Sequence, residues 1–178
     1  MKKAVLFTAL FAAFLMLINL SPIGVAGLSE TSGSADILDF EVGYTYDEAH
    51  EMLSALGEGG RIFYLKRIMP LDFPFPFFYM LCFISWTALL LKLIKLKNRV
   101  KYLLFIPVLA MLCDWTENIG IIVMLTGYPD LPSWAVLLSS LSGTFKFIFM
   151  GGSILIICVL LIIFIYSAIR KSNQLKNR

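Results

Sequence analysis

Long apolar runs alternate with short charged segments along the chain. Four runs, at about residues 4–26, 73–94, 102–126 and 143–168, are each close to or above the roughly 20 residues that an α-helix needs to cross a bilayer. The segment 28–70 is polar and acidic, and the tail 170–178 is basic. The pattern predicts an all-α, polytopic membrane protein with a single membrane domain, residues 1–178. Its four transmembrane helices form a bundle with a small extracytoplasmic helical cap at 28–70.

The composition indicates that lipid is the main solvent of this chain. Hydrophobic residues make up 59% of its 178 residues, and the mean hydropathy is +0.83, whereas about half of a soluble domain is apolar. The net charge is +3, but the charges are segregated by position, so nucleic-acid binding is not indicated. Cys82, Cys113 and Cys158 all fall in apolar runs, which predicts no disulfide framework. We expect membrane lipids as partners and no cofactor, and we leave a protein partner or a homo-oligomer open.

The basic residues predict the orientation. Eleven of the 15 fall in three short segments: Lys2 with Lys3, the loop from Lys92 to Lys101, and the tail from Arg170 to Arg178. Because basic segments next to transmembrane helices stay on the cytoplasmic side, all three are expected there. This requires an even number of crossings, which four helices provide. We predict a multi-pass protein of the plasma (inner) membrane with both termini in the cytoplasm.

The first and the last apolar runs each allow more than one interpretation. Residues 1–27 also fit a cleavable signal peptide, but the run from Ala4 to Leu20 is longer than the usual signal core, so we expect it to remain as the first helix if Ser21 to Ala26 continues it. The last run, from Trp134 to Ile169, would measure about 54 Å as one helix, against about 30 Å of hydrocarbon. It must lie partly along the interface, tilt, bend near Gly143 or the Gly151–Gly152 pair, or project from the membrane.

The cap segment carries recognisable helix signals. Thr45 and Glu48 form a capping-box pattern, and helical spacing then continues to Gly57. A second short helix, Arg61 to Ile68, is expected to stop before Pro70. The single histidine, His50, is expected to be a solvated helix residue, with loose cation binding as the alternative. No metal site is predicted, because His50 is far in sequence from every cysteine.

The candidate site is an intramembrane polar cluster. Asp114, Glu117 and Asn118 share one helical face in the middle of the third run, and Lys146 is the basic residue set within the fourth. Charges at such depth persist only when something compensates them. The cluster can be interhelical glue, part of a proton, ion or small-solute pathway, or the site of a membrane-embedded enzyme that acts on a lipid with Asp114 or Glu117 as general base. We favour a non-enzymatic role.

The partner of Lys146 is left open by the sequence. It can turn inward to Asp114 and Glu117, or it can reach the outer surface, because 20 apolar residues from Phe147 follow it. In the second case Asp72 is its expected partner. Asp72 and Tyr79, two helical turns apart, form a candidate outer-face polar site, and Trp86 continues the same face. Ser139 and Gly143 have the small-xxx-small spacing of closely packed membrane helices.

Several short motifs carry a resemblance to a known family. They are GYTYDEA and LGEGGR between Gly43 and Arg61, LDFPFPFFY from Leu71 to Tyr79, DWTEN from Asp114 to Asn118, and Lys146. Together they span about residues 39–150, and the chain resembles a family of small, predicted four-helix membrane proteins that has no assigned function. The resemblance implies the four-helix layout and the same polar positions, and it implies no activity.

Overall fold

The computed structural model describes residues 1–33, 36–95 and 98–176. Helices make up 87% of the structure, and no strand occurs in the described part of the chain. Four helical stretches are long and apolar enough to cross a membrane: Lys2–Ser32, Gly57–Ile94, Val100–Gly127 and Ser133–Lys171. The all-helical class and the number of candidate spans are therefore confirmed. Lys97 of the predicted basic loop and Arg178 of the predicted tail lie outside the described residues.

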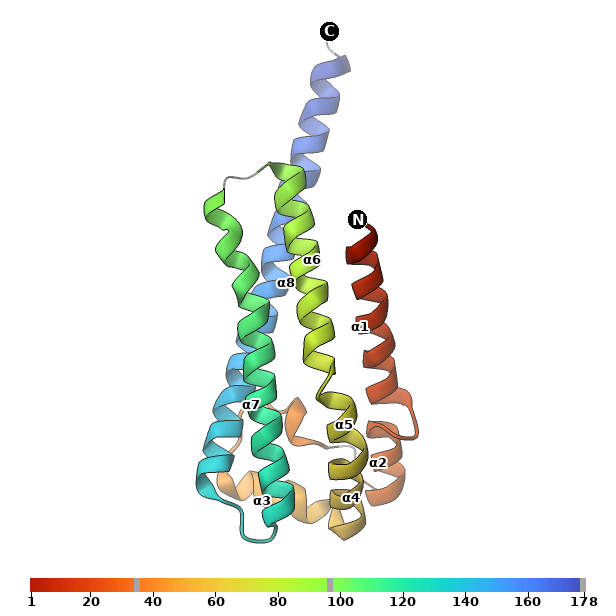
Figure 1. The fold of residues 1–178 in the computed structure, drawn as a ribbon, viewed down its shortest axis with the longest axis vertical. Coiled ribbons are helices and arrows are strands. Elements are labelled where there is room, and N and C mark those ends of the chain that lie inside the picture. The colour runs from red at the N-terminus through yellow and green to blue at the C-terminus, as the bar shows by residue number, and fades with distance from the viewer. Residues whose placement is uncertain (34–35, 96–97, 177–178) are drawn as a thin grey trace.

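Four long helices run side by side in alternating directions (Figure 1). They are α1 (Lys2–Leu20), α6 (Phe75–Ile94), α7 (Ile106–Gly127) and α8 (Ser133–Lys176). The short 3-10 helix η3 (Asn98–Phe105) leads into α7. The N-terminus, the α6–α7 connection and the C-terminal part of α8 point toward one end of the molecule, here named the tail end. The opposite end, here named the cap end, holds the remaining helices.

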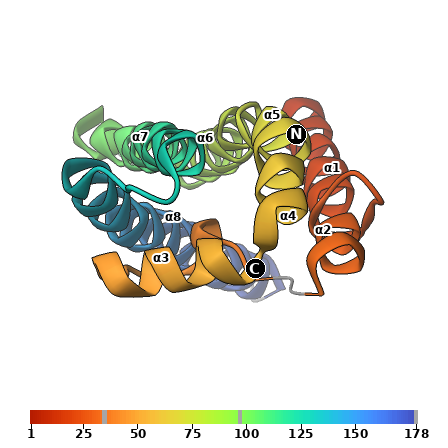
Figure 2. The same cartoon turned by 90° about the horizontal axis from the view of Figure 1, so that it is seen from below.

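Short helices form the cap at the cap end of the bundle (Figures 1 and 2). These are α2 (Val25–Ser32), the 3-10 helix η1 (Leu38–Phe40), α3 (Tyr46–Ala55) and α4 (Gly57–Phe63). Of these, α3 lies across the bundle (Figure 2). The predicted capping box at Thr45 and Glu48 is present at the start of α3. Buried cap residues such as Leu38 and Leu53 pack in one core with Ile121 and Met124 of α7. Cap and bundle therefore share a hydrophobic core, which holds the cap in a defined position.

The first helix is shorter than predicted. It ends at Leu20, and a turn precedes α2 at Val25, so Ser21 to Ala26 does not continue it. Pro22 cannot donate a helical hydrogen bond, and the chain folds back tightly enough that a Cβ on Gly24 would collide with the Ile18 carbonyl. The expected extension of the first span to residue 26 as one continuous helix is therefore wrong.

The predicted stop before Pro70 is also wrong. After α4 the chain continues as a π-helix, η2 (Tyr64–Ile68), and then as α5 (Met69–Asp72) before α6 begins at Phe75. Proline removes a donor and crowds the carbonyl four residues earlier. A wider π-turn just before Pro70 relieves that conflict, since its hydrogen bonds skip one more residue. The helical path therefore runs from the cap into the bundle.

The last helix is longer than the bundle and reaches both of its ends. α8 is a single helix of 44 residues, about 66 Å long. Its first part packs against α3 of the cap, and its last part extends beyond the α6–α7 connection (Figure 1). Between these parts it exposes large apolar side chains, among them Leu155, Ile162 and Tyr166. α8 stays one helix through Gly143 and the Gly151–Gly152 pair and extends beyond the bundle at the tail end (Figure 1). Its projection from a membrane stays a prediction.

Candidate functional site

The centre of the candidate site is one face of α7. Asp114, Glu117 and Asn118 lie on this face and are buried, with Glu117 and Asn118 fully inaccessible to solvent. The face is directed at α6 and α8, the helices against which α7 packs. Ser139 of α8 donates a hydrogen bond of 2.9 Å to the Glu117 main-chain carbonyl. The polar face therefore turns into the protein rather than toward its outer surface.

Lys146 contacts Glu117 across the α7–α8 interface. The Lys146 Nζ lies 2.6 Å from Glu117 Oε2, and both side chains are buried. The same nitrogen donates a hydrogen bond of 3.0 Å to the main-chain oxygen of Asp39. Between the two alternatives left by the sequence, Lys146 takes the inward position and does not pair with Asp72.

A close helix approach makes room for this ion pair. Gly143 lies one turn before Lys146 on α8, and a Cβ at this position would collide with the Glu117 carboxylate. Gly120 of α7 faces Ser139 at a similarly short distance, where a Cβ would also have no room. The predicted small-residue spacing of Ser139 and Gly143 thus lies in the α7–α8 contact, and Gly143 directly shapes the space of the carboxylate.

Asp72 and Tyr79 belong to the same network as the acids of α7. Asn118 Nδ2 donates to Asp72 Oδ2 at 2.6 Å and to Asp114 Oδ1 at 3.3 Å. The Tyr79 hydroxyl donates to Asp114 Oδ2 at 3.1 Å. The two candidate sites predicted from the sequence therefore form one cluster. Trp86 is not part of it, because its indole nitrogen donates to Thr8 of α1 at 2.8 Å.

The cap adds a fourth carboxyl group that sequence reasoning missed. Asp39 of η1 is buried and accepts a short hydrogen bond from the hydroxyl of Tyr64, which is also buried. Burial raises the pKa of Asp39 above its ordinary value of 3.8, although the charge of Lys146 and the Tyr64 hydrogen bond act in the opposite direction. The signal in the sequence was an acid between Leu38 and Phe40, in the apolar part of an otherwise polar segment.

The cluster has more acids than its base can balance. We define it by its polar residues: Asp39, Tyr64, Asp72, Tyr79, Asp114, Glu117, Asn118 and Lys146. It holds four carboxyl groups and one ammonium group. Three buried oxygens, Asp39 Oδ1, Glu117 Oε1 and Asn118 Oδ1, have no hydrogen-bond partner. Because unpaired buried charge costs several kcal/mol per ion, at most one or two of these acids can be ionised at low cost.

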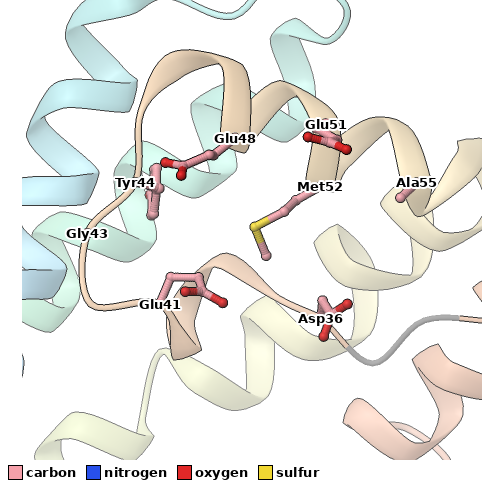
Figure 3. A pocket seen from close by; sticks show the side chains of 8 residues that line it. All are labelled: Asp36, Glu41, Gly43, Tyr44, Glu48, Glu51, Met52 and Ala55. Atoms are coloured by element: carbon pink, nitrogen blue, oxygen red, sulfur yellow. The ribbon is translucent and has the colours of Figure 1, made fainter.

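Tyr44 lies between the cluster and a pocket of the cap. Its side chain is 9% exposed, its hydroxyl is buried without a hydrogen-bond partner, and its amide donates to Ser140 Oγ at 2.8 Å. Burial raises the pKa of Tyr44 above its usual value and the nearby Glu117 and Asp39 carboxyls raise it further, whereas the neighbouring Ser139 hydroxyl acts in the opposite direction. The hydroxyl therefore belongs to the surroundings of the cluster, while the same residue also lines the pocket (Figure 3).

The pocket itself is acidic and opens at the cap surface. It has a volume of about 380 Å³ and is lined by Asp36, Glu41, Gly43, Tyr44, Glu48, Glu51, Met52 and Ala55. In Figure 3, Asp36 and Glu41 face the helix α3 across the pocket, and the side chain of Met52 points into it. Hydrogen bonds from the Thr45 amide and hydroxyl lower the pKa of Glu48, which keeps this carboxyl ionised.

Among the described residues, no group of three or more His, Cys, Asp or Glu side chains is placed so that it could hold a metal ion. His50 stacks on the ring of Tyr128, with centroids 5.3 Å apart, and is half-buried. The expectation of a freely solvated histidine therefore holds only in part, because the stacked ring covers one face.

Comparison with protein-family models, curated proteins and solved structures finds no match for this chain. The resemblance to small four-helix membrane proteins stays a prediction, and the function must be argued from the site alone.

Proposed function

We propose that this chain is an integral membrane protein whose buried cluster binds protons that arrive from the cap end. The observation that carries the proposal is the excess of four buried carboxyl groups over the single amine of Lys146 within the cluster. Its polar groups form two bonded sets, one around Lys146 with Glu117 and Asp39 and one around Asn118 with Asp72, Asp114 and Tyr79. Two neighbouring acids cannot both ionise cheaply, so such a cluster holds protons whose number changes with pH. The proton occupancy in turn controls how tightly Asp39 of the cap is held at the bundle.

The four apolar helices support insertion in a membrane. Large apolar side chains on α1 and α8 are exposed, as expected for a lipid-facing surface. Along the Gly57–Ile94 stretch, the exposed Arg67 and Lys92 are separated by 25 residues, which corresponds to about 38 Å at the rise of an ideal α-helix. This is close to the roughly 40–45 Å thickness of a bilayer including its headgroup regions. Lipid headgroups are therefore the partners we propose for these basic residues.

This placement puts the cluster near the cap-side boundary of the hydrocarbon. Lys146 directly precedes 20 apolar residues of α8, and Asp72 directly precedes the apolar helix α6. By the positive-inside rule the tail end faces the cytoplasm, so the cap end faces the outside of the plasma membrane. The cluster then lies at the level where protons from the outer solution have the shortest distance to travel.

An apolar layer separates the cluster from the tail end. Next to Tyr79 and Asp114, the buried residues Met80, Phe83, Ala110 and Met111 pack together, with Phe11 of α1 against them. An apolar layer of this kind opposes passage of ions because it offers them no compensating polar groups. If protons reach the cluster only from the cap end, they cannot cross the protein. We therefore propose that proton binding changes the conformation of the protein and that the cluster does not conduct protons across the membrane.

The rival function, a lipid enzyme, has less support from the geometry. A general base must reach its substrate within hydrogen-bond distance. Glu117 is fully buried, and Asp114 is 3% exposed and bonded to Tyr79 and Asn118. Both carboxyls are buried and directed at neighbours inside the protein, Glu117 at Lys146 and Asp114 at Tyr79 and Asn118, so we assign no catalytic residue.

The test is a pH titration of the buried carboxyl groups in the purified full chain, followed by infrared spectroscopy. Protonated carboxyl groups in apolar surroundings give a band distinct from those of exposed acids. We expect this band to change reversibly with pH, and to lose intensity in Asp114→Asn and in Glu117→Gln. Glu30→Gln, which removes an exposed acid of α2, is the control and should leave the band unchanged. A band that does not change with pH, or that keeps its full intensity in both cluster variants, would overturn the proposal.

A further inference from the structure

We propose that the acidic pocket is the entrance through which protons reach the cluster, and that the ring of Tyr44 is the barrier between the two. This inference rests on the proposed function, because it concerns the route to the same proton-binding cluster. It adds a residue and a surface to which the sequence assigned no role.

Tyr44 lines the pocket and lies next to the cluster. Its buried hydroxyl has no hydrogen-bond partner. The titratable groups that act on this hydroxyl are Glu117 of α7 and Asp39 of η1, and the hydroxyl of Ser139 of α8 is also close. Glu48 and Glu51 of α3 line the same pocket as Tyr44. An unsatisfied polar group that is nine-tenths buried indicates that a proton or a water molecule fits beside it.

The position of Tyr44 is set by its main chain. Its amide is bonded to Ser140, and the preceding Gly43 has a φ of +90°, in the region that favours glycine. A Cβ on Gly43 would also come within 2.9 Å of the Thr144 hydroxyl. The loop is therefore held against α8, which keeps the Tyr44 ring between the pocket and the cluster.

The pocket has the charge of an entrance for cations. Of the eight described residues that line it, four are acidic and none is basic. A cleft lined by one sign of charge concentrates ions of the opposite sign and raises their arrival rate by roughly 10- to 1,000-fold at low ionic strength. Salt screens this effect, because the Debye length falls to about 10 Å at 0.1 M. The pocket thus accelerates delivery without itself holding the proton.

The experiment measures how fast the cluster takes up protons after a rapid drop in pH, with the infrared band of the buried carboxyls as the signal. Tyr44→Ala removes the ring and should raise the uptake rate, because the barrier between pocket and cluster is then absent. Tyr44→Phe keeps the ring and should retain the wild-type rate. Leu53→Ala, which loosens the cap core without changing a pocket residue, controls for general opening of the cap and should leave the rate near the wild-type value.

A second measurement does not depend on a substitution in the core. The double variant Glu41→Gln with Glu51→Gln changes two exposed acids of the pocket, and it should slow proton uptake at low salt and have no effect at high salt. Glu30→Gln is the matched control outside the pocket.

The outcomes separate the two proposals. If the equilibrium band does not titrate in any variant, the proposed function fails. If it titrates normally but Tyr44→Ala and the pocket variant both keep the wild-type rate, the cluster binds protons by another route and this inference is overturned. Equal acceleration by Leu53→Ala and Tyr44→Ala would likewise overturn the role of the ring.

Discussion

Lys146 and Glu117, 29 positions apart in the sequence, form an ion pair of 2.6 Å in the interior of the protein. The pair joins α7 to α8, and the second hydrogen bond of Lys146, to the main chain of Asp39, joins both helices to the cap. One amine therefore connects three parts of the chain, and the remaining acids of the cluster are arranged around this connection.

Removal of Lys146 should destabilise the fold strongly. Lys146→Met leaves the Glu117 carboxylate buried without its partner, and breaking a buried pair in this way costs about 3–5 kcal/mol. The double variant with Glu117→Gln should recover much of that loss, because the stranded charge is gone. The measurement is the free energy of unfolding in detergent, followed by tryptophan fluorescence. Lys92→Met, at an exposed position of α6, is the control. Additive effects of the two cluster substitutions would contradict the coupling.

Gly143 should not tolerate a side chain. Gly143→Ala places a methyl group against the Glu117 carboxylate, and overpacking of this kind costs about 1–3 kcal/mol. Gly151→Ala on the same helix meets no atom within 4 Å, so it should be neutral or slightly stabilising, since alanine favours helix by up to about 1 kcal/mol. Melting temperatures of the two variants provide the comparison. A Gly143→Ala protein as stable as the Gly151→Ala protein would show that the carboxylate is free to move aside.

Asp39 should make the cap more stable in acid. Its folded-state pKa is raised above the ordinary value of 3.8, so folding favours the protonated form. Its favourable contribution is complete below pH 3.8 and is lost as the pH rises through the raised folded pKa. Asp39→Asn should therefore flatten the rise in cap stability on acidification, measured by hydrogen exchange of the cap amides. An unchanged pH dependence in this variant would assign the effect to other acids of the cluster.

Glu48 is a control for Asp39, because its pKa is shifted in the opposite direction. Its pKa is lowered below 4.5 because the amide and hydroxyl of Thr45 bond to its carboxylate. Its contribution to the stability of α3 is present above pH 4.5 and is lost as the pH falls through its folded value. Glu48→Gln should weaken the start of α3 near neutral pH and remove this acid-induced loss. The same hydrogen-exchange experiment reports both residues.

The orientation of the helices can be tested independently of the cluster. Reporter fusions after Asn98 and after Arg178 should read as cytoplasmic, and a fusion within the loop from Ser29 to Gly60 should read as external. Three basic segments support this arrangement. An inverted result at any of the three positions would contradict the topology, and with it the external access that we propose for the pocket.

Local patterns in the sequence were sufficient for the four long helices and for the capping box of this fold, but not for where the first helix ends or for the helical path through Pro70. The apolar runs predict four long helices because only a helix satisfies its own backbone in lipid, and four such helices are observed. The capping box at Thr45 depends on residues three positions apart, so it too was visible. Asp114, Glu117 and Asn118 share a face through helical periodicity alone, and all three lie buried on that face.

The tertiary structure decided which groups meet. The sequence could not choose a partner for Lys146, because a pair between separate helices depends on how those helices pack, and it placed Asp72 and Tyr79 in a separate site. Packing of α5, α6 and α7 joins these residues to Asp114 and Asn118. Docking of the cap adds Asp39 and Tyr64. The segment around Asp39 has no helical periodicity to mark it, and the helix predicted around Tyr64 did not indicate a partner for its hydroxyl. The number of carboxyl groups around one amine is a property of the folded protein, since it results from contacts between distant parts of the chain.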